Sequence, residues 1–412
     1  MARNIITALD VGTSTVQTVV AEKKKGEGGL KILGMGVASS SGLRRGLVVD
    51  LGEAASAIMK SVDEARRSAG VPIRSVWLSV GGAQAFVSSS RGVVAVSRAD
   101  GEITREDINR SIAAAETFIT KNPNREILHI IPRDFRVDNE AGIKDPVGMH
   151  GIRLEVDALI IECSAPLLKN LLKCVEAVGL DVEDYVFSPL AAAETVLTKR
   201  QKELGVMLLD VGGGTSSFIV FEEGAPIHAG VIPIGGGHIT NDIAIGLRTH
   251  VDVAEEIKTA HGSSLPDEVA KRDNIRLADF VEGEEAVYSR RALAEIIEAR
   301  LQDLYELLQK ELRKIDRAQL LPSGIVLIGG SALIPGIREL TRRHMKLPVE
   351  FGLPQHFAEL LDEKSALPLS TILGVLQWAY GRTFVAQDSG WNARMVRVGR
   401  SGFGRWLRSL LP

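Results

Sequence analysis

The sequence has little cysteine and no long apolar run. Cys163 and Cys174 are the only cysteines among its 412 residues, too few for a disulfide framework or a multi-cysteine zinc site. Apolar runs stay well below the length of about 18 residues that a membrane-spanning helix needs. Residues 1–12 lack the apolar core and cleavage pattern of a signal peptide. These absences predict a soluble protein of a reducing compartment, with both cysteines as small core residues.

A strong net charge is also absent. Lysine and arginine number 49 and aspartate and glutamate 52, which leaves a formal net charge of −3. The chain therefore has no global positive field for nucleic acid, and attraction to an anionic surface must be local. Hydrophobic residues make up 45% and charged residues 25%, which excludes a largely disordered chain. The length predicts about two or three domains.

One strand–turn–strand pattern occurs twice. The first copy has strands at 5–9 and 16–20, and the second has strands at 206–209 and 216–221. Repetition of this kind predicts two related half-molecules.

Both turns have the composition of a phosphate-binding loop. Glycine lets backbone N–H groups approach phosphate oxygens closely, and neighbouring hydroxyls add donors. An aspartate at each strand end, Asp10 or Asp210, could hold Mg²⁺ through water. A single loop is better explained as a hairpin turn, whereas two facing copies favour a nucleotide site. The predicted phosphate-loop residues are Asp10, Gly12, Thr13, Ser14, Thr15, Asp210, Gly212, Gly213, Gly214 and Thr215.

A further glycine turn and a charged pair complete the predicted nucleotide site. The turn follows a buried strand at 325–328, and close backbone approach there suits adenine or ribose. Glu255 and Lys258 lie three residues apart on one helix face and could bracket the nucleoside, although a surface ion pair is the default interpretation. The predicted residues are Gly235, Gly236, Glu255, Lys258, Gly329, Gly330 and Ser331.

In their order, these segments resemble the ATPase superfamily of actin, sugar kinases and chaperones. Small residues at 191–193 and at Gly374 would let two connecting helices, 188–197 and 371–380, cross closely at a hinge. Within the superfamily the whole chain is most similar to the FtsA family. The most specific stretch is Asp145-Pro-Val-Gly-Met-His-Gly-Ile-Arg-Leu-Glu155, and residues 42–50 are a second FtsA-like segment.

The resemblance implies an α/β, actin-like (ribonuclease H-like, duplicated) ATPase fold with an FtsA-specific inserted subdomain and a C-terminal amphipathic helix. In the insert, the pattern predicts short strands at 86–88 and 93–96 and a helix at 105–118 with Thr104 as its N-cap. The implied division is 1–81 and 165–197 for subdomain 1A, 82–164 for inserted subdomain 1C, 198–226 and 301–382 for 2A, 227–300 for 2B, 383–400 for a flexible linker and 401–412 for the amphipathic helix.

The resemblance also implies a function in cell division. An FtsA protein binds ATP and Mg²⁺, self-assembles, and tethers FtsZ filaments to the cytoplasmic face of the inner membrane at the septum. It recruits later division proteins through subdomain 1C. The acidic C-terminal peptide of FtsZ would bind at helix 289–313, through Arg290, Arg291 and Arg300.

One departure from the superfamily concerns hydrolysis. Ser188 stands where chaperone ATPases and MreB carry a glutamate and actin a glutamine that orients the attacking water. A hydroxyl is a poor base at neutral pH, and no lysine follows the first loop before Lys23. We expect at most a weak ATPase, with Asp210, or secondarily Asp10, positioning water.

The end of the chain has the pattern of an interfacial membrane helix. Five apolar side chains at helical spacing span an arc of about 140°, with arginines opposite. Residues 387–412 contain five arginines and one aspartate, a local charge of +4. Such a segment binds anionic membrane weakly, and many copies on a polymer bind by avidity; the alternative is a helix docked on the protein's own core. The predicted membrane-binding residues are Phe403, Arg405, Trp406, Leu407, Arg408, Leu410 and Leu411.

Three other functions compete with this interpretation. A PilM-like ATP-binding scaffold of pilus assembly shares the fold and the insert, but would not need the terminal helix. A small-molecule kinase needs a base for the acceptor hydroxyl, and the sequence offers no obvious candidate. A chaperone ATPase needs a peptide-binding domain, and only about 30 residues follow Arg382.

Overall fold

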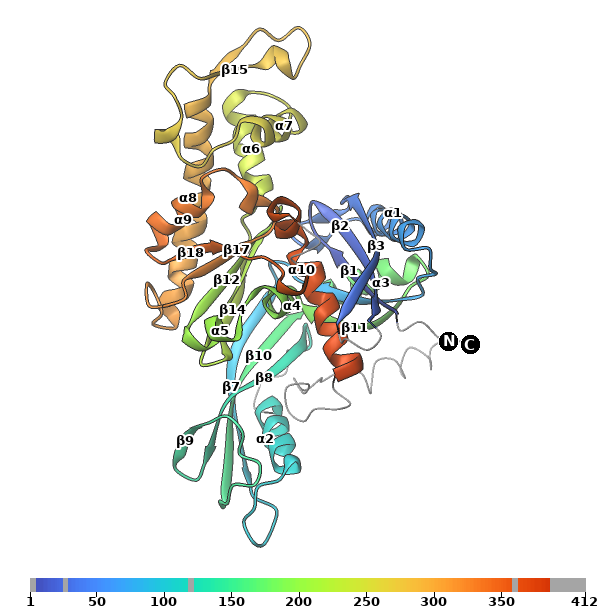
Figure 1. Cartoon of the computed structure of the whole chain (residues 1–412), viewed down its shortest axis with the longest axis vertical. Helices are drawn as coiled ribbons and strands as arrows, with labels where there is room; N and C mark the ends of the chain where they lie inside the picture. The colour runs from blue at the N-terminus through green and yellow to red at the C-terminus, as the bar shows by residue number, and fades with distance from the viewer. Residues whose placement is uncertain (1–4, 25–28, 118–121, 358–361, 386–412) are drawn as a thin grey trace.

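The computed structural model describes residues 5–24, 29–117, 122–357 and 362–385. These residues form an α/β protein with three main β-sheets (Figure 1). Two five-stranded sheets occupy the middle of the molecule, and a four-stranded sheet extends from them at one end (Figure 1). Within these ranges, no helix combines the length and apolar character needed to cross a membrane.

The first sheet is a three-stranded meander extended by two parallel strands. Its strands in spatial order are β3 (Leu30–Ser39), β2 (Thr15–Lys23), β1 (Ile5–Val11), β6 (Ser75–Val80) and β11 (Asp181–Phe187). Neighbours in the meander are antiparallel, whereas β6 is parallel to β1 and β11 is parallel to β6. Two helices, α1 (Leu51–Ala69) and α3 (Ala165–Ala177), pack together on this half.

Helix α1 covers the free edge of the first sheet. Gly36 on β3 allows this approach, because a β-carbon there would lie 2.0 Å from the carbonyl oxygen of Ser61. The outward N–H of Val37 then donates to the Glu64 carboxylate at 2.9 Å. Capping the edge in this way protects it from pairing with another chain.

The second sheet repeats the first in strand order and direction. Its strands in the same order are β14 (Ala225–Ile232), β13 (Ser216–Glu222), β12 (Val206–Val211), β17 (Ile325–Ile328) and β18 (Val349–Phe351). The meander is again antiparallel, and the last two strands are again parallel to their neighbours. The predicted duplication is therefore confirmed.

The remaining elements of the second half lie around and beyond its sheet. They are α5 (Lys199–Leu204), α6 (Gly236–Leu247), α7 (Val251–His261), α8 (Arg290–Lys314), α9 (Ile337–Met345) and the short strands β15 (Asn274–Arg276) and β16 (Val287–Ser289). The predicted helix at 289–313 is confirmed as α8, with ends that differ by one residue, and α6 packs against both α7 and α8. With β15 they project from the molecule opposite the four-stranded sheet (Figure 1).

The inserted segment forms the third sheet with one helix on it. The strands are β7 (Ala85–Ala95), β10 (Arg153–Ser164), β8 (Arg125–Val137) and β9 (Glu140–Ile143), and the helix is α2 (Arg105–Thr117). The prediction of two short strands at 86–88 and 93–96 is wrong, because β10 pairs with β7 along its whole length. Gly92 marks a close contact rather than a break: a β-carbon there would lie 1.9 Å from the Ser111 carbonyl oxygen of α2.

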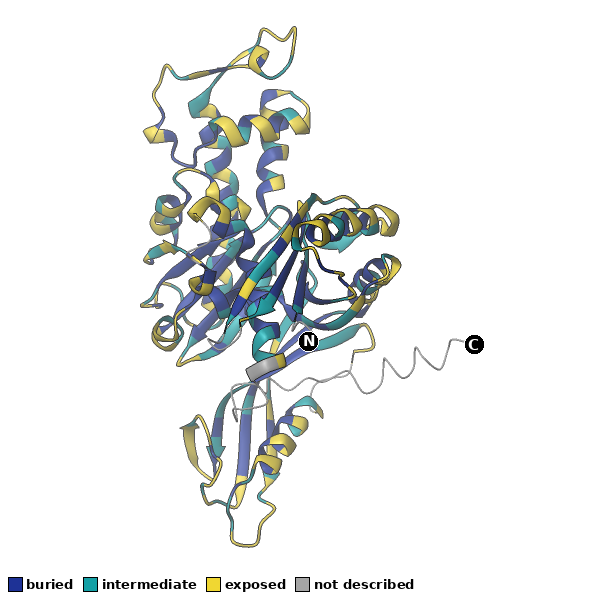
Figure 2. Ribbon diagram, turned by 45° about the vertical axis from the view of Figure 1, so that its right-hand side comes forward, coloured by how far each residue is buried: buried dark blue, intermediate teal, exposed yellow. Residues whose placement is uncertain are grey.

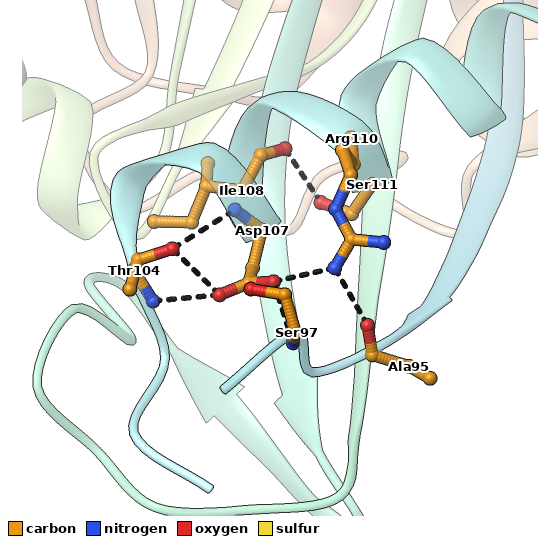
Figure 3. Close-up of polar contacts among 7 residues, drawn as sticks. All are labelled: Ala95, Ser97, Thr104, Asp107, Ile108, Arg110 and Ser111. Carbon is orange, nitrogen blue, oxygen red and sulfur yellow. Dashed lines mark hydrogen bonds and ion pairs between the residues drawn. The ribbon is translucent and has the colours of Figure 1, made fainter. Parts of the chain in front are cut away.

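A buried aspartate fixes the start of α2 (Figure 3). Asp107 accepts hydrogen bonds from the backbone N–H and the hydroxyl of Thr104, at 2.9 and 2.7 Å, and from the Ser97 N–H at 3.0 Å. Arg110 donates to the same carboxylate. Burial alone would raise the pKa of Asp107, but these hydrogen bonds hold it well below its usual range. The predicted cap at Thr104 is confirmed, since its hydroxyl accepts from the Asp107 N–H.

Two helices cross between the halves. They are α4 (Ser188–Val196) and α10 (Glu363–Tyr380). The sequence predicts a start at residue 371 for the second helix, whereas the structure starts it two turns earlier, with Asp362 accepting from the Ser365 N–H. Pro368 lies inside this helix. Buried residues concentrate in the two large sheets and exposed ones on the outer helices (Figure 2).

Candidate functional site

The two repeated turns have the same backbone hydrogen bond. In the first, Gly12 N donates to Thr15 O at 3.0 Å, and in the second, Gly212 N donates to Thr215 O at 3.0 Å. A β-carbon at either glycine would lie within 3.0 Å of the accepting oxygen. The duplication therefore extends to the detail of the predicted phosphate loops.

The two loops lie directly against each other. A β-carbon on Gly213 would be 1.8 Å from the hydroxyl oxygen of Ser14, and one on Gly214 would be 2.7 Å from that of Thr13. The fold therefore brings loops 200 residues apart in sequence into contact across the junction of the two halves. Glycine is needed here because any side chain would separate the loops.

Each half contributes one aspartate to the bottom of this junction. Asp10 accepts a hydrogen bond from the Ser79 hydroxyl, and Asp210 accepts one from the Thr371 hydroxyl at 3.0 Å. Burial raises the pKa of both carboxyls, and the pKa of Asp210 reaches about 6. The hydrogen bonds from the two hydroxyls oppose this rise, whereas the nearby charge of Asp10 raises the pKa of Asp210 further. Two desolvated carboxylates near each other favour a bound cation.

One turn of α10 links the parts of the site. The Leu367 carbonyl accepts from the Gly329 N–H at 3.0 Å, and the Pro368 carbonyl accepts from the Gln17 amide at 3.2 Å. Thr371, on the same turn, is the donor to Asp210. Thr371, Gln17 and Ser79 were not predicted from the sequence. For Gln17 a signal existed, because it falls opposite Asp10 in the hairpin register.

The predicted adenosine-binding segments also meet at this junction. Gly236 N donates to Gly212 O at 2.9 Å, and the Ser331 hydroxyl donates to the same carbonyl at 3.2 Å. A β-carbon on Gly236 would lie 2.4 Å from the Ser331 hydroxyl. The amino end of α6 and the turn after β17 are therefore both hydrogen-bonded to the second predicted phosphate loop. Gly235, Gly329 and Gly330 belong to the same turns.

The charged pair on α7 lies beside this end of α6. Lys258 Nζ donates to the Glu255 carboxylate at 2.6 Å, to the Thr240 hydroxyl at 2.8 Å and to the Gly236 carbonyl at 3.4 Å. The lysine is largely buried, whereas half of the glutamate side chain is exposed. The pair is thus linked to the turn at Gly236 rather than isolated on the surface, and its partner Thr240 was not predicted from the sequence.

A hairpin from the first half lies over the first loop. It consists of β4 (Leu43–Arg44) and β5 (Leu47–Val48), within the second FtsA-like segment. Gly46 N donates to the Thr13 hydroxyl at 2.9 Å. Burial and the positive charge of Arg45 lower the pKa of His238, in the first turn of α6. The positive charge of Arg45, in the first half, therefore lies near α6 of the second half. This proximity was not predicted from the sequence.

The residues present fit a nucleotide accompanied by a hydrated metal ion. The glycine turns form a cradle that β-carbons would fill, and the loop hydroxyls and N–H groups can donate to phosphate. In the described ranges, no group of three or more His, Cys, Asp or Glu side chains could coordinate a metal directly. The pair of carboxylates, Asp10 and Asp210, is compatible with a cation held through its water molecules, as Mg²⁺ often is.

The other predicted sites are placed as follows. Each of the three arginines near α8 is already paired: Arg290 with Asp273 at 2.8 Å, Arg291 with Asp267 at 2.9 Å and Arg300 with Asp242 at 2.6 Å. Ser188 begins α4, and a β-carbon on Gly81 would lie 2.9 Å from its hydroxyl. The predicted membrane-binding residues lie outside the described residues, as does most of the predicted linker.

Comparisons with known proteins agree with this architecture. Residues 207–374 match the family model described as "Cell division protein FtsA", and residues 82–162 match "SHS2 domain inserted in FTSA". The FtsA of Pseudomonas aeruginosa is 37% identical over 374 residues, covering 91% of this chain and 89% of the relative. The FtsA of Escherichia coli K12 is 32% identical over 415 residues, covering 99% and 97%.

Solved structures show the fold at lower identity. The chain is similar to the PilM-PilN type IV pilus biogenesis complex, with a TM-score of 0.65, 16% identity and coverage of 90% of this chain and 97% of that chain. It is also similar to MreB5 of Spiroplasma citri bound to ADP, with a TM-score of 0.55, 14% identity and coverage of 94% and 99%. The fold is therefore the actin-like α/β fold with the inserted SHS2 domain, as the sequence predicted.

Proposed function

The chain belongs to the FtsA family of actin-like cell division proteins, and from this premise we propose that it binds ATP, self-assembles and tethers FtsZ filaments to the membrane. It acts at the cytoplasmic face of the inner membrane, at the division septum. One observation carries the proposal furthest: Gly213 of the second loop lies directly against Ser14 of the first. This contact puts the phosphate-binding groups of both halves on one junction, so that a bound nucleotide can hold the halves together.

ATP is held by the two loops and the adenosine segments. Thr13, Ser14 and Thr215, with the loop N–H groups, donate to the phosphates, while Gly236 and Ser331 line the nucleoside end. Glu255 and Lys258 bracket the ribose and adenine. Mg²⁺ supplies the positive charge that this cradle lacks, since no lysine lies in either loop, and Asp10 and Asp210 hold it through water.

Hydrolysis is slow in this proposal. Asp210 is the group that positions water, because its carboxylate lies near that of Asp10 and accepts a hydrogen bond from the Thr371 hydroxyl. Ser188 adds only a hydroxyl at the start of α4, and a hydroxyl is a poor base. The nucleotide therefore regulates assembly more than it serves as a substrate.

The membrane contact is made by residues 401–412. Their apolar side chains enter the headgroup boundary, and Arg405 and Arg408 meet anionic lipid, each basic residue adding about 1 kcal/mol. One copy binds weakly, and a filament of many copies binds by avidity.

FtsZ binds at α8, through Arg290, Arg291 and Arg300. All three are paired with carboxylates, so an acidic peptide has to compete with these partners. Such competition favours a weak, reversible contact. Later division proteins dock on the inserted subdomain, which extends away from both halves (Figure 1).

Vesicle co-sedimentation with ATP and Mg²⁺ tests the membrane part of the proposal. The full chain is expected to pellet with anionic vesicles but not with neutral ones. Truncation after Gly399 and the change Trp406→Glu should both leave the protein in the supernatant. Ser409→Glu makes the same charge change on the polar side of the helix and should retain most of the binding. Equal behaviour of all four proteins would contradict the tether.

A PilM-like scaffold remains the second candidate, favoured by the likeness to the PilM-PilN complex. That likeness is at 16% identity and concerns the fold alone, whereas relatives named FtsA reach 37% identity over most of the chain. The vesicle experiment separates the two, because the scaffold would not need residues 401–412.

A further inference from the structure

Gln17 is a buried polar residue with an unused acceptor. Its side chain is on β2 and only 5% of the residue is exposed. The amide nitrogen donates to the Pro368 carbonyl at 3.2 Å and lies 3.5 Å from the Thr15 hydroxyl. The amide oxygen, Oε1, is buried and has no hydrogen-bond partner among the described residues. An unsatisfied buried oxygen of this kind costs free energy unless a ligand or water supplies a donor.

The orientation of this amide is set by its surroundings. If the amide were turned over, Oε1 would face the Pro368 carbonyl oxygen, and two acceptors would oppose each other. The carbonyl of α10 therefore holds Nε2 toward the helix and leaves Oε1 as the free group.

The free oxygen belongs to the same side of the sheet as Asp10. Gln17 and Asp10 are direct partners in the β1–β2 hairpin, so their side chains project from one face with β-carbons about 5 Å apart. One oxygen of Asp10 is bonded to Ser79 and one of Asp210 to Thr371. Among the described residues, these two hydrogen bonds leave the other carboxylate oxygens, Oδ2 of Asp10 and Oδ1 of Asp210, available to a ligand. Three acceptors available to a ligand therefore gather around this junction.

A cluster of acceptors requires a ligand that is rich in donors. A hydrated divalent cation has this character, because each of its water molecules presents two hydrogens and its charge compensates the two carboxylates. A phosphate group does not, since it would add further acceptors.

We propose that Gln17 Oε1 accepts a hydrogen bond from a water molecule of the divalent cation that Asp10 and Asp210 hold, which makes Gln17 a positioning residue for that cation. The inference rests on the proposed nucleotide function and adds to it a residue from outside both loops. Because Gln17 also bonds to Pro368 of α10, it joins the cation to the helix that contacts both halves.

The test compares nucleotide affinity with and without Mg²⁺. The probe is fluorescent mant-ATP, titrated at pH 8 in MgCl₂ or in EDTA, and the readout is the ratio of the two dissociation constants. Gln17→Leu removes the acceptor at similar size, and Gln17→Glu keeps an acceptor and adds charge. Gln309→Leu is the matched control, because Gln309 also donates to a backbone carbonyl, that of His344 at 2.7 Å, but lies on α8.

Gln17→Leu is expected to reduce the Mg²⁺-dependent gain in affinity about tenfold, with little change in EDTA. Gln17→Glu is expected to keep or increase the gain, and Gln309→Leu to match the natural chain. Loss of the Mg²⁺-dependent gain in both Gln17 variants would overturn the inference, because both remove the structural hydrogen bond to Pro368. An unchanged gain in both variants would also overturn it, because the acceptor at Gln17 would then make no difference. If the natural chain bound no nucleotide, the proposed function would fail as well; binding without a Mg²⁺ effect would overturn only this inference.

Discussion

Gly374 of α10 packs against Ala191 of α4 so closely that a β-carbon on Gly374 would lie 2.2 Å from the Ala191 carbonyl oxygen. The oxygen belongs to the backbone of a buried helix, so it cannot move aside without shifting α4. This contact lies where the two halves meet, and it explains why small residues are found on both helices.

Gly374→Ala should therefore destabilise the protein by about 1–3 kcal/mol, the usual cost of overpacking. Thermal unfolding measures the effect. Gly381→Ala is the control, because a β-carbon there meets nothing within 4 Å, and it should be neutral or slightly stabilising. Equal melting temperatures for the two variants would show that the helices do not cross as described.

Gly213→Ala should weaken ATP binding about tenfold or more. Its β-carbon would lie only 1.8 Å from the Ser14 hydroxyl oxygen, so the two predicted phosphate loops would have to move apart. Mant-ATP titration provides the measurement. Gly52→Ala serves as control, since its β-carbon would meet only the Asp50 carboxylate at 3.4 Å. Unchanged affinity in Gly213→Ala would mean that the loop contact is not needed for binding.

The stability of the nucleotide-free protein should fall as pH rises through the range between the unfolded and folded pKa values of Asp210. The folded pKa is raised from 3.8 to about 6, so the folded state binds more protons than the unfolded state in this interval. Asp210 therefore opposes folding above pH 6, by about 2–3 kcal/mol. Asp210→Asn keeps an acceptor for Thr371 and should be more stable than the natural chain at pH 7.

Urea unfolding at pH 4, 5, 6 and 7 provides the comparison. The natural chain should lose stability relative to Asp210→Asn over this series, and Mg²⁺ with ATP should restore it. A constant difference between the two proteins from pH 4 to 7 would exclude the raised pKa as the cause.

Asp107→Ala should destabilise the inserted subdomain by about 3 kcal/mol or more, because it leaves several buried donors unpaired. Limited proteolysis of residues 82–164 would report this loss, with cleavage becoming faster. Asp100→Ala is the control, since Asp100 pairs with Arg98 on the exposed surface and should change little. Similar cleavage rates in the two variants would contradict the anchoring role of Asp107.

Much of the fold could be predicted because its signals are local. The turns at Asp10 and Asp210 repeat one short pattern, and buried strands flank both, so the duplication was visible without a structure. Gly92 was misleading, because a glycine in a strand signals either a break or a close neighbour, and only the position of α2 distinguishes them. Pro368 was similarly misleading for the start of α10, since proline usually limits a helix to the residues after it.

The contact between the two glycine turns could be expected from the repeated glycine pattern, whereas the hydrogen bonds from distant elements to the two aspartates could not. Thr371 and Ser79 bond to the aspartates across 161 and 69 residues, and nothing in the neighbourhood of either residue signals this. The pairing of the arginines on α8 was equally hidden, because Asp242 and Asp273 approach them through the tertiary fold.

Vesicle flotation of FtsZ filaments tests the central claim most directly, because it requires the nucleotide site, the membrane segment and the FtsZ contact together. FtsZ, anionic vesicles and this protein are mixed with ATP and Mg²⁺ and spun through a density gradient. FtsZ is predicted to float with the vesicles when the full chain and ATP are present, and to stay at the bottom with the chain truncated after Gly399 or with Gly213→Ala. The account would be contradicted if FtsZ stayed at the bottom with the full chain and ATP, or floated equally well with the truncated chain.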